Sequence, residues 1–200
     1  MTALGIPAGL TMNFLPVAGD AGVVSYSDPD LAEKGIARAS GGAAEHVVCC
    51  LGGYQIIEAD TDGVRWTDLR DYMLRHNCTI TIRRIPNLDI IGAHKMVDFW
   101  ISRVGYQYSF SGDAELGAML VARKLGPTAL NLTEDALKAF HWDKLKKHEE
   151  FCSQLWADAA KSAGYFRDDN DLGLVAPLGI LQNKSLNSIM EWNRTDWSNP

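Results

Sequence analysis

The sequence contains little of what disulfide-rich, metal-binding or membrane-spanning proteins carry. Only four of its 200 residues are cysteines, and no two of them have the Cys-x-x-Cys spacing of structural zinc sites. Cys49 and Cys50 are adjacent, so on a strand they would point to opposite faces, and we expect reduced thiols without a disulfide framework. No apolar run reaches the about 18 residues that a membrane-spanning helix needs. We therefore predict no metal site, no cofactor and no membrane span.

An excess of basic residues is also missing. The formal net charge is −6, which argues against a non-specific nucleic-acid-binding protein. The few basic clusters, Arg83-Arg84 and 144–147, are predicted to be solvated surface. The first basic residue is Lys34, so the N-terminus lacks the charged segment that begins a secretory signal. We expect a protein that is made in the cytoplasm and has no nucleic-acid partner.

The composition that is present is ordinary for a globular protein. Hydrophobic residues make up 46% and charged residues 22%, and 200 residues fit a single domain over 1–200. Strand patterns come first in the chain and helical patterns later, with little β-α-β alternation. We therefore predict an α+β fold with a small antiparallel sheet packed against helices. The predicted strands are 21–26, 45–51, 54–59, 63–66 and 78–85, and the predicted helices are 31–39, 68–74, 90–104, 113–125, 134–147 and 152–163.

Two of these helices and the C-terminal tail carry more detailed predictions. Thr67 is expected to cap the helix over 68–74. The polar tail from Asn183 onward has no predicted element. In the helix over 90–104, large apolar residues recur at helical spacing and predict the buried face, which would consist of Ile90, Ala93, Val97, Trp100, Ile101 and Val104.

The segment 149–156 places a thiol, Cys152, in the first turn of a helix. A cysteine at a helix N-terminus lies at the positive end of the peptide dipoles, which favours the thiolate. The alternative is a buried structural thiol, because cysteine is among the most often buried residues. The helix is expected to end at Gly164, and the apolar spacing predicts that it buries Leu155, Trp156, Ala159 and Ala160.

A nucleophilic cysteine needs a base within hydrogen-bond reach and a third group that holds the base. Of the five histidines, four have polar neighbours and are expected at the surface. His46 differs because it starts the apolar strand that continues through Leu51. A hydrogen-bonded structural histidine is the alternative for this position.

Glu58 lies on the return strand of the same predicted hairpin, between apolar neighbours. A carboxylate there is costly unless it is paired, and His46 is the natural partner. A strict two-residue turn at Gly52-Gly53 would place Glu58 on the opposite face from His46. We predict a three-residue loop or a bulge, which places both on one face. Asp60 is the alternative orienting residue.

The order of these motifs resembles a known family. Gly19-Asp20, Glu45-His46-Val47-Val48, Ile57-Glu58-Ala59, Gly105-Tyr106-Gln107-Tyr108 and Phe151-Cys152-Ser153-Gln154-Leu155 follow one another as in the circularly permuted papain-like amidases. These form the YiiX-like branch of the NlpC-type cell-wall peptidase superfamily. The resemblance covers roughly 19–181 and implies a permuted papain-like fold, in which the histidine and its acidic partner precede the cysteine.

The resemblance also implies roles for individual residues. Cys152 would be the nucleophile, His46 the base and Glu58 its orienting partner. Tyr108 would lie at the mouth of the site and help to bind an oxyanion, with a core or rim aromatic as the alternative. The segment 111–148 would be a helical insertion or lid. The candidate substrate-binding residues are Asp20, whose alternative role is in a turn or strand start, together with Ser153 and Gln154.

A cysteine amidase or endopeptidase acting on peptidoglycan stem peptides is the function that the resemblance implies. Because a secretory signal is missing, such an enzyme would reach a periplasm or cell wall by a specialised secretion system or a phage particle, as a toxin-like effector. An inhibitor or immunity protein would then be a further partner. The alternatives are a lipid acyl hydrolase or acyltransferase that uses the same triad, and a catalytically inactive binding module.

Overall fold

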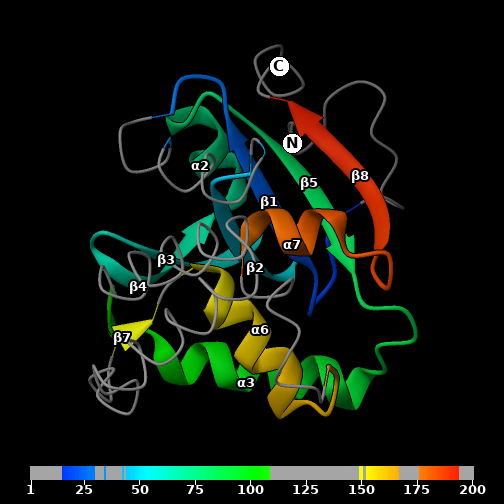
Figure 1. Cartoon of the computed structure of the whole chain (residues 1–200). Helices are drawn as coiled ribbons and strands as arrows, with labels where there is room; N and C mark the ends of the chain where they lie inside the picture. The colour runs from blue at the N-terminus through cyan, green and yellow to red at the C-terminus, as the bar shows by residue number, and fades with distance from the viewer. Residues whose placement is uncertain are drawn as a thin grey trace, which may run out of the picture.

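The computed structural model describes residues 15–29, 34, 42, 44–108, 149–150, 152–166 and 176–193. A six-stranded sheet, with every neighbouring pair antiparallel, forms the centre of this part of the chain (Figure 1). The predicted α+β architecture is therefore confirmed. The strand order is β4 (Gly63–Asp68), β3 (Gln55–Asp60), β2 (His46–Gly52), β1 (Ala21–Tyr26), β5 (Cys78–Arg84) and β8 (Asn187–Asn193).

Four helices and one short strand pair complete the described elements. The strand pair is parallel and consists of β6 (Gln107–Tyr108) and β7 (Glu149–Glu150). No helix among the described residues is both long and apolar enough to cross a membrane. The predicted insertion over 111–148 and most of the predicted helix over 31–39 lie outside the described residues. The helices are α2 (Leu69–Arg75), α3 (Ile90–Arg103), α6 (Cys152–Ser162) and α7 (Pro177–Gln182).

Two hydrophobic cores lie on opposite faces of the sheet. The first packs the sheet against α3 and α6, which lie side by side in Figure 1, and the second packs it against α2. Because side chains alternate along a strand, Cys49 belongs to the first core and Cys50 to the second, as predicted. The residues of β2 from His46 to Cys50 are all buried, since both of its faces are covered.

Two indole hydrogen bonds fix the beginning of α6. The Trp156 Nε1–H donates to the Gly19 carbonyl oxygen at 3.1 Å, and the Trp100 Nε1–H donates to the Leu155 carbonyl oxygen at 3.1 Å. These bonds tie the first turns of α6 to the segment before β1 and to α3. The predicted apolar face of α6 is confirmed, because Leu155, Trp156, Ala159 and Ala160 are all buried.

The predicted buried face of α3 is confirmed only in part, since Trp100 is buried and Val97 packs partly buried against the first core, whereas three other members of that face are exposed. Ile90, Ile101 and Val104 are exposed by 72%, 43% and 41%. The buried residues are Gly92, Met96 and Trp100, spaced by four residues each. At Gly92 a Cβ atom would lie 2.8 Å from the ring of Tyr165. The absence of a side chain therefore lets the Tyr165 ring approach the helix backbone. A pattern built on large apolar side chains misses such a contact.

The end of β4 and the polar tail also differ from the predictions. Asp68, not Thr67, caps α2, and its carboxylate accepts a hydrogen bond from the Arg70 N–H at 2.9 Å. Thr67 belongs to β4 and bonds to another strand. The tail forms β8, which pairs with β5. A strand at this position had no counterpart in the predicted elements.

The prediction that Arg83 and Arg84 are solvated surface is wrong as well. Arg83 is 8% exposed, and its Nη2 donates to the carbonyl oxygens of Asn183 and Leu186 at 2.6 and 2.7 Å. Arg84 donates two hydrogen bonds to the buried carboxylate of Asp20, both at 2.7 Å. Both arginines therefore hold the fold together. The basic cluster over 144–147 lies outside the described residues.

Candidate active site

A bulge in the β2–β3 hairpin sets the register of the candidate site. Cys50 lies opposite Ile56 and Gly52 opposite Gln55, with a register shift between the two pairs. Gly52 has a φ of 114°, in the left-handed region that glycine adopts without strain. The bulge places Val48 opposite Glu58, so His46, two residues before Val48, shares a face with Glu58. The predicted register is confirmed.

His46 and Glu58 meet in a buried environment. The Nε2 atom of His46 lies 3.7 Å from the Oε2 atom of Glu58, and the side chains are 9% and 0% exposed. This distance is an ion-pair contact, longer than a hydrogen bond. Neither atom has a hydrogen-bond partner among the described residues. The carboxylate therefore faces the edge of the imidazole ring without another group that competes for Oε2.

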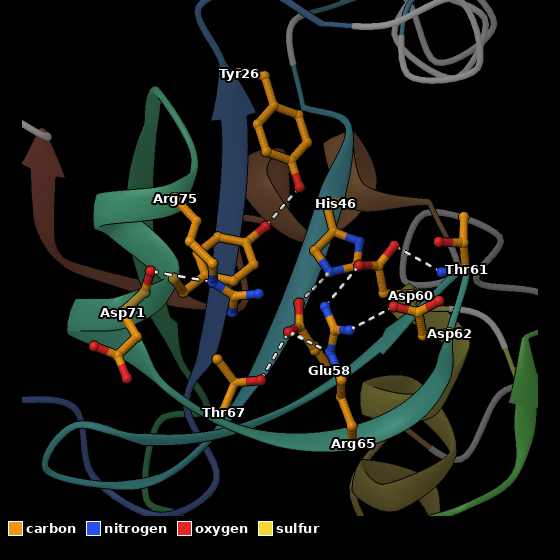
Figure 2. A network of polar contacts seen from close by, with 11 residues as sticks. Tyr26, His46, Glu58, Asp60, Thr61, Asp62, Arg65, Thr67, Asp71 and Arg75 are labelled. Atoms are coloured by element: carbon orange, nitrogen blue, oxygen red, sulfur yellow. Dashed lines mark hydrogen bonds and ion pairs between the residues drawn. The ribbon is translucent and has the colours of Figure 1, made fainter.

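The other oxygen of Glu58 is held from β4. Arg65 Nε donates to Oε1 of Glu58 at 3.1 Å, and Thr67 Oγ1 donates to the same atom at 2.8 Å (Figure 2). Arg65 also reaches Asp60 and Asp62, each at 2.9 Å. Burial would raise the pKa of Glu58, but the contacts with His46, Thr67 and Arg65 outweigh it and lower the pKa to about 2. Glu58 is therefore ionised at neutral pH.

An aromatic ring from α2 supports the imidazole. The rings of His46 and Tyr72 are stacked, with 6.3 Å between centroids and 10° between planes. The Tyr72 hydroxyl is within 2.5 Å of the Tyr26 hydroxyl. Tyr72 is fully buried, and burial raises its pKa well above the usual value. The uncharged Tyr72 ring therefore lies nearly parallel to the imidazole.

Cys152 lies close enough to His46 to control its protonation. Burial by itself would lower the pKa of His46, but a negative charge on Cys152, a hydrogen bond to Cys152 and the contact with Glu58 raise it to about 10. Nε2 faces Glu58, so Nδ1 is the ring nitrogen farther from that carboxylate. Cys152 is itself 2% exposed. His46 is therefore coupled electrostatically to Cys152 and to Glu58.

Tyr108 lies beside the strand that leads to Cys152. It pairs with Glu150 in the β6–β7 ladder, two residues before the nucleophile candidate, and packs partly buried against the first core. Ser153 is fully buried, and the Gln154 side chain hydrogen-bonds to Asp158. The structure therefore brings Tyr108 to the start of α6, while the binding roles of Ser153 and Gln154 stay predictions.

The two remaining acidic candidates are engaged elsewhere. The carboxylate of Asp20 is fully buried, forms an ion pair with Arg84, and accepts a hydrogen bond from the Val17 N–H at 2.9 Å. These contacts match the alternative role at a strand start. Asp60 bonds to Arg65, and Glu58 is the carboxylate that faces His46, so the alternative with Asp60 as orienting residue is not needed.

Sequence reasoning missed Arg65, Thr67 and Tyr72. Arg65 lies directly opposite Glu58 in the β3–β4 hairpin, where Asp60 pairs with Gly63 across a two-residue turn. Counting back from that turn would have found this cross-strand pair. Tyr72 had no comparable signal, because its contact with His46 depends on how α2 packs on the sheet.

Comparisons with known proteins show what the fold is similar to. No protein-family model and no curated protein matches the sequence. Among solved structures, the crystal structure of the metalloprotein YiiX from Escherichia coli O157:H7, assigned to DUF1105, aligns with 88% of this chain and 98% of its own chain. The TM-score is 0.57 and the sequence identity is 14%. The chain therefore has a YiiX-like fold.

Proposed function

We propose that the protein is a cysteine hydrolase of the permuted papain-like type that cleaves an amide bond, with peptidoglycan stem peptides as its substrate. One observation carries the proposal. A cysteine at the first residue of a helix shares a buried site with a histidine, and that histidine faces an ionised carboxylate. This arrangement has the parts of a thiol hydrolase, in which the base activates the nucleophile and a third group orients the base.

The reaction begins with transfer of the Cys152 proton to Nδ1 of His46. The thiolate attacks the amide carbonyl carbon, forming a carbon–sulfur bond and a tetrahedral oxyanion. The backbone N–H of Cys152 and the Tyr108 hydroxyl are the oxyanion donors in this proposal. The imidazolium then protonates the leaving nitrogen, and the carbon–nitrogen bond breaks to give an acyl-enzyme.

Water completes the cycle. Neutral His46 takes a proton from water, whose oxygen attacks the thioester carbonyl, and the carbon–sulfur bond breaks to release the carboxylic acid. Glu58 stays ionised throughout and stabilises each imidazolium, since its Oε2 faces Nε2. Tyr72 keeps the ring plane fixed while the proton moves at Nδ1.

No step is assigned to a metal. YiiX from Escherichia coli is described as a metalloprotein, but the described residues of this chain contain no group of three or more histidine, cysteine or acidic side chains that could hold an ion. The Oε1 atom of Glu58 is also taken by a guanidinium and a hydroxyl. A cation is disfavoured beside Arg65.

Digestion of isolated peptidoglycan tests the proposal. We expect the wild-type protein to release new muropeptides, identified by mass spectrometry, and Cys152→Ala to release none. Cys50→Ala is the matched control, because Cys50 is also buried but belongs to the core beneath α2, and it should keep the activity. Peptidoglycan left intact by folded wild-type protein would contradict the substrate. Acyl exchange on phospholipids in its place would favour the lipid acyltransferase alternative.

A further inference from the structure

We propose that Arg65 is a positioning residue of this site, which aims the free oxygen of Glu58 at His46 and so sustains the charged imidazole. The inference rests on the proposed function, because it concerns the same Cys152–His46 pair. Arg65 touches neither of those two residues in any contact that the described part of the chain shows. Its effect would pass through Glu58 alone.

The contacts divide the two oxygens of Glu58 between two tasks. Oε1 accepts hydrogen bonds from Arg65 Nε and Thr67 Oγ1, while Oε2 has no hydrogen-bond partner among the described residues and faces His46 (Figure 2). A carboxylate held at one oxygen by two donors cannot rotate freely about its terminal bond. The donors therefore fix the direction of the other oxygen.

The guanidinium is itself anchored at its far end. Its Nη2 bonds to Asp60 and its Nη1 to Asp62, so three carboxylates share one planar group (Figure 2). This fork geometry belongs to arginine and is not available to lysine. Arg65 is 30% exposed and Asp62 is 77% exposed, so the anchoring runs from the surface inward to the buried Glu58.

The sign of the effect separates positioning from direct electrostatics. A guanidinium that acted directly on the imidazolium would repel it, so removal of Arg65 would raise the pKa of His46. A guanidinium that acts by aiming Glu58 would support the imidazolium, so its removal would lower the pKa of His46. An opposite charge within about 4 to 6 Å commonly changes a pKa by about 1 to 3 units, and a displaced Glu58 would lose part of that effect on His46.

An NMR titration of the His46 ring in the full chain measures this directly. We expect the pKa of His46 to fall by about one unit in Arg65→Met, less in Arg65→Lys, which keeps the charge, and less in Thr67→Val, which removes one donor. Arg70→Met is the matched control. Arg70 makes a comparable ion pair with Asp68 and is 40% exposed, and its loss should leave His46 unchanged.

A double substitution makes the test specific. In Glu58→Gln the pKa of His46 should already be low, and adding Arg65→Met should lower it no further. If Arg65→Met proves unfolded by circular dichroism, Arg65→Lys and Thr67→Val carry the same test. A His46 pKa that is unchanged or raised in the folded Arg65 and Thr67 variants would overturn the inference.

The titration also separates this inference from the proposed function. A wild-type His46 with an ordinary pKa would refute the pairing with Cys152 and the inference together. A raised wild-type pKa that does not respond to Arg65 would refute only the role of Arg65. Intact peptidoglycan beside a raised and Arg65-dependent pKa would refute only the substrate.

Discussion

Two buried carboxylates, Asp20 and Glu58, are each paired with an arginine, but the pairing differs. Both oxygens of Asp20 bond to Arg84, at 2.7 Å each, and one also accepts a backbone N–H. Only one oxygen of Glu58 bonds to Arg65, and the other faces His46 at 3.7 Å. Both oxygens of Asp20 are therefore occupied by hydrogen bonds, and we call this carboxylate saturated. Glu58 keeps one oxygen without a hydrogen bond, and that oxygen faces His46, a group that can change its protonation.

Two buried thiols, Cys50 and Cys152, differ in a similar way. Cys50 lies near Asp20, and burial and the Asp20 charge raise its pKa well above the usual value. Cys152 lies instead beside a histidine whose Nε2 atom faces the Glu58 carboxylate at 3.7 Å. A buried structural cysteine is inert, whereas a neighbouring imidazolium favours the reactive thiolate form of a cysteine. Burial alone does not distinguish them, since all four cysteines are buried.

Removal of the His46 imidazole should have the largest effect on the difference in reactivity between Cys152 and Cys50. In His46→Ala we expect the rate of alkylation of Cys152 by iodoacetamide at pH 7 to fall roughly ten- to a hundredfold, because a thiol without a base to activate it is only a few per cent thiolate at this pH. His94→Ala, which removes an exposed histidine of α3, should leave the rate unchanged. Peptide mass spectrometry after timed labelling measures both. Equal rates in the two variants would end the assignment of His46.

Removal of the saturated carboxylate should instead reduce stability. Asp20→Asn leaves Arg84 without its charged partner, and breaking a buried pair typically costs about 3 to 5 kcal/mol. We expect the lower end of that range, because Arg84 is 30% exposed. Urea unfolding followed by circular dichroism measures the loss. Alkylation of Cys152 in the folded variant should match wild type, and a slower rate would give Asp20 a place in the site.

Acid titration should reveal the contribution of the ionised Glu58 carboxylate to stability. The pKa of Glu58 is lowered from 4.5 to about 2, so its ionised form stabilises the fold above pH 4.5, and this contribution is lost as the pH falls towards 2. The shift corresponds to roughly 3 kcal/mol. Unfolding free energies measured between pH 6 and 2 should therefore fall less steeply in Glu58→Gln than in wild type. Parallel pH profiles would show that Glu58 is not held as described.

The smallest effect is expected at the ring that supports the imidazole. Tyr72→Phe removes the hydroxyl that bonds to Tyr26 but keeps the ring face against His46. We expect a loss of about 1 kcal/mol in unfolding free energy and no change in the alkylation rate of Cys152. Tyr72→Leu, which removes the stacked ring, is the informative partner. A reactive thiol in that variant would show that the stacking is dispensable.

The local parts of the site could be predicted from the sequence. The hairpin, its glycine turn and the shared face of His46 and Glu58 follow from residues within thirteen positions of one another, whose pairing a turn dictates. The start of α6 at Cys152 follows from the periodicity of four apolar residues. These are short-range patterns, and the structure contains all of them.

The long-range parts could not be predicted. Arg84 reaches Asp20 across 64 positions of sequence, and a pair of adjacent arginines is more often surface. β8 pairs with β5 although only Ile189, Met190 and Trp192 of its seven residues are apolar, because the partner strand supplies the hydrogen bonds. The buried face of α3 begins at Gly92, where close packing favours the absence of a side chain. Each depends on tertiary contacts that no local pattern encodes.

The ratio of alkylation rates at Cys152 and Cys50 in one sample of native wild-type protein tests the central claim most directly. Both thiols are buried in the same molecule, so differences in folding and concentration cancel. The account predicts that Cys152 is modified rapidly at pH 7, while Cys50 is modified only when the protein unfolds. Equal rates for the two thiols would contradict an activated Cys152 and leave only a protein that binds without cleaving.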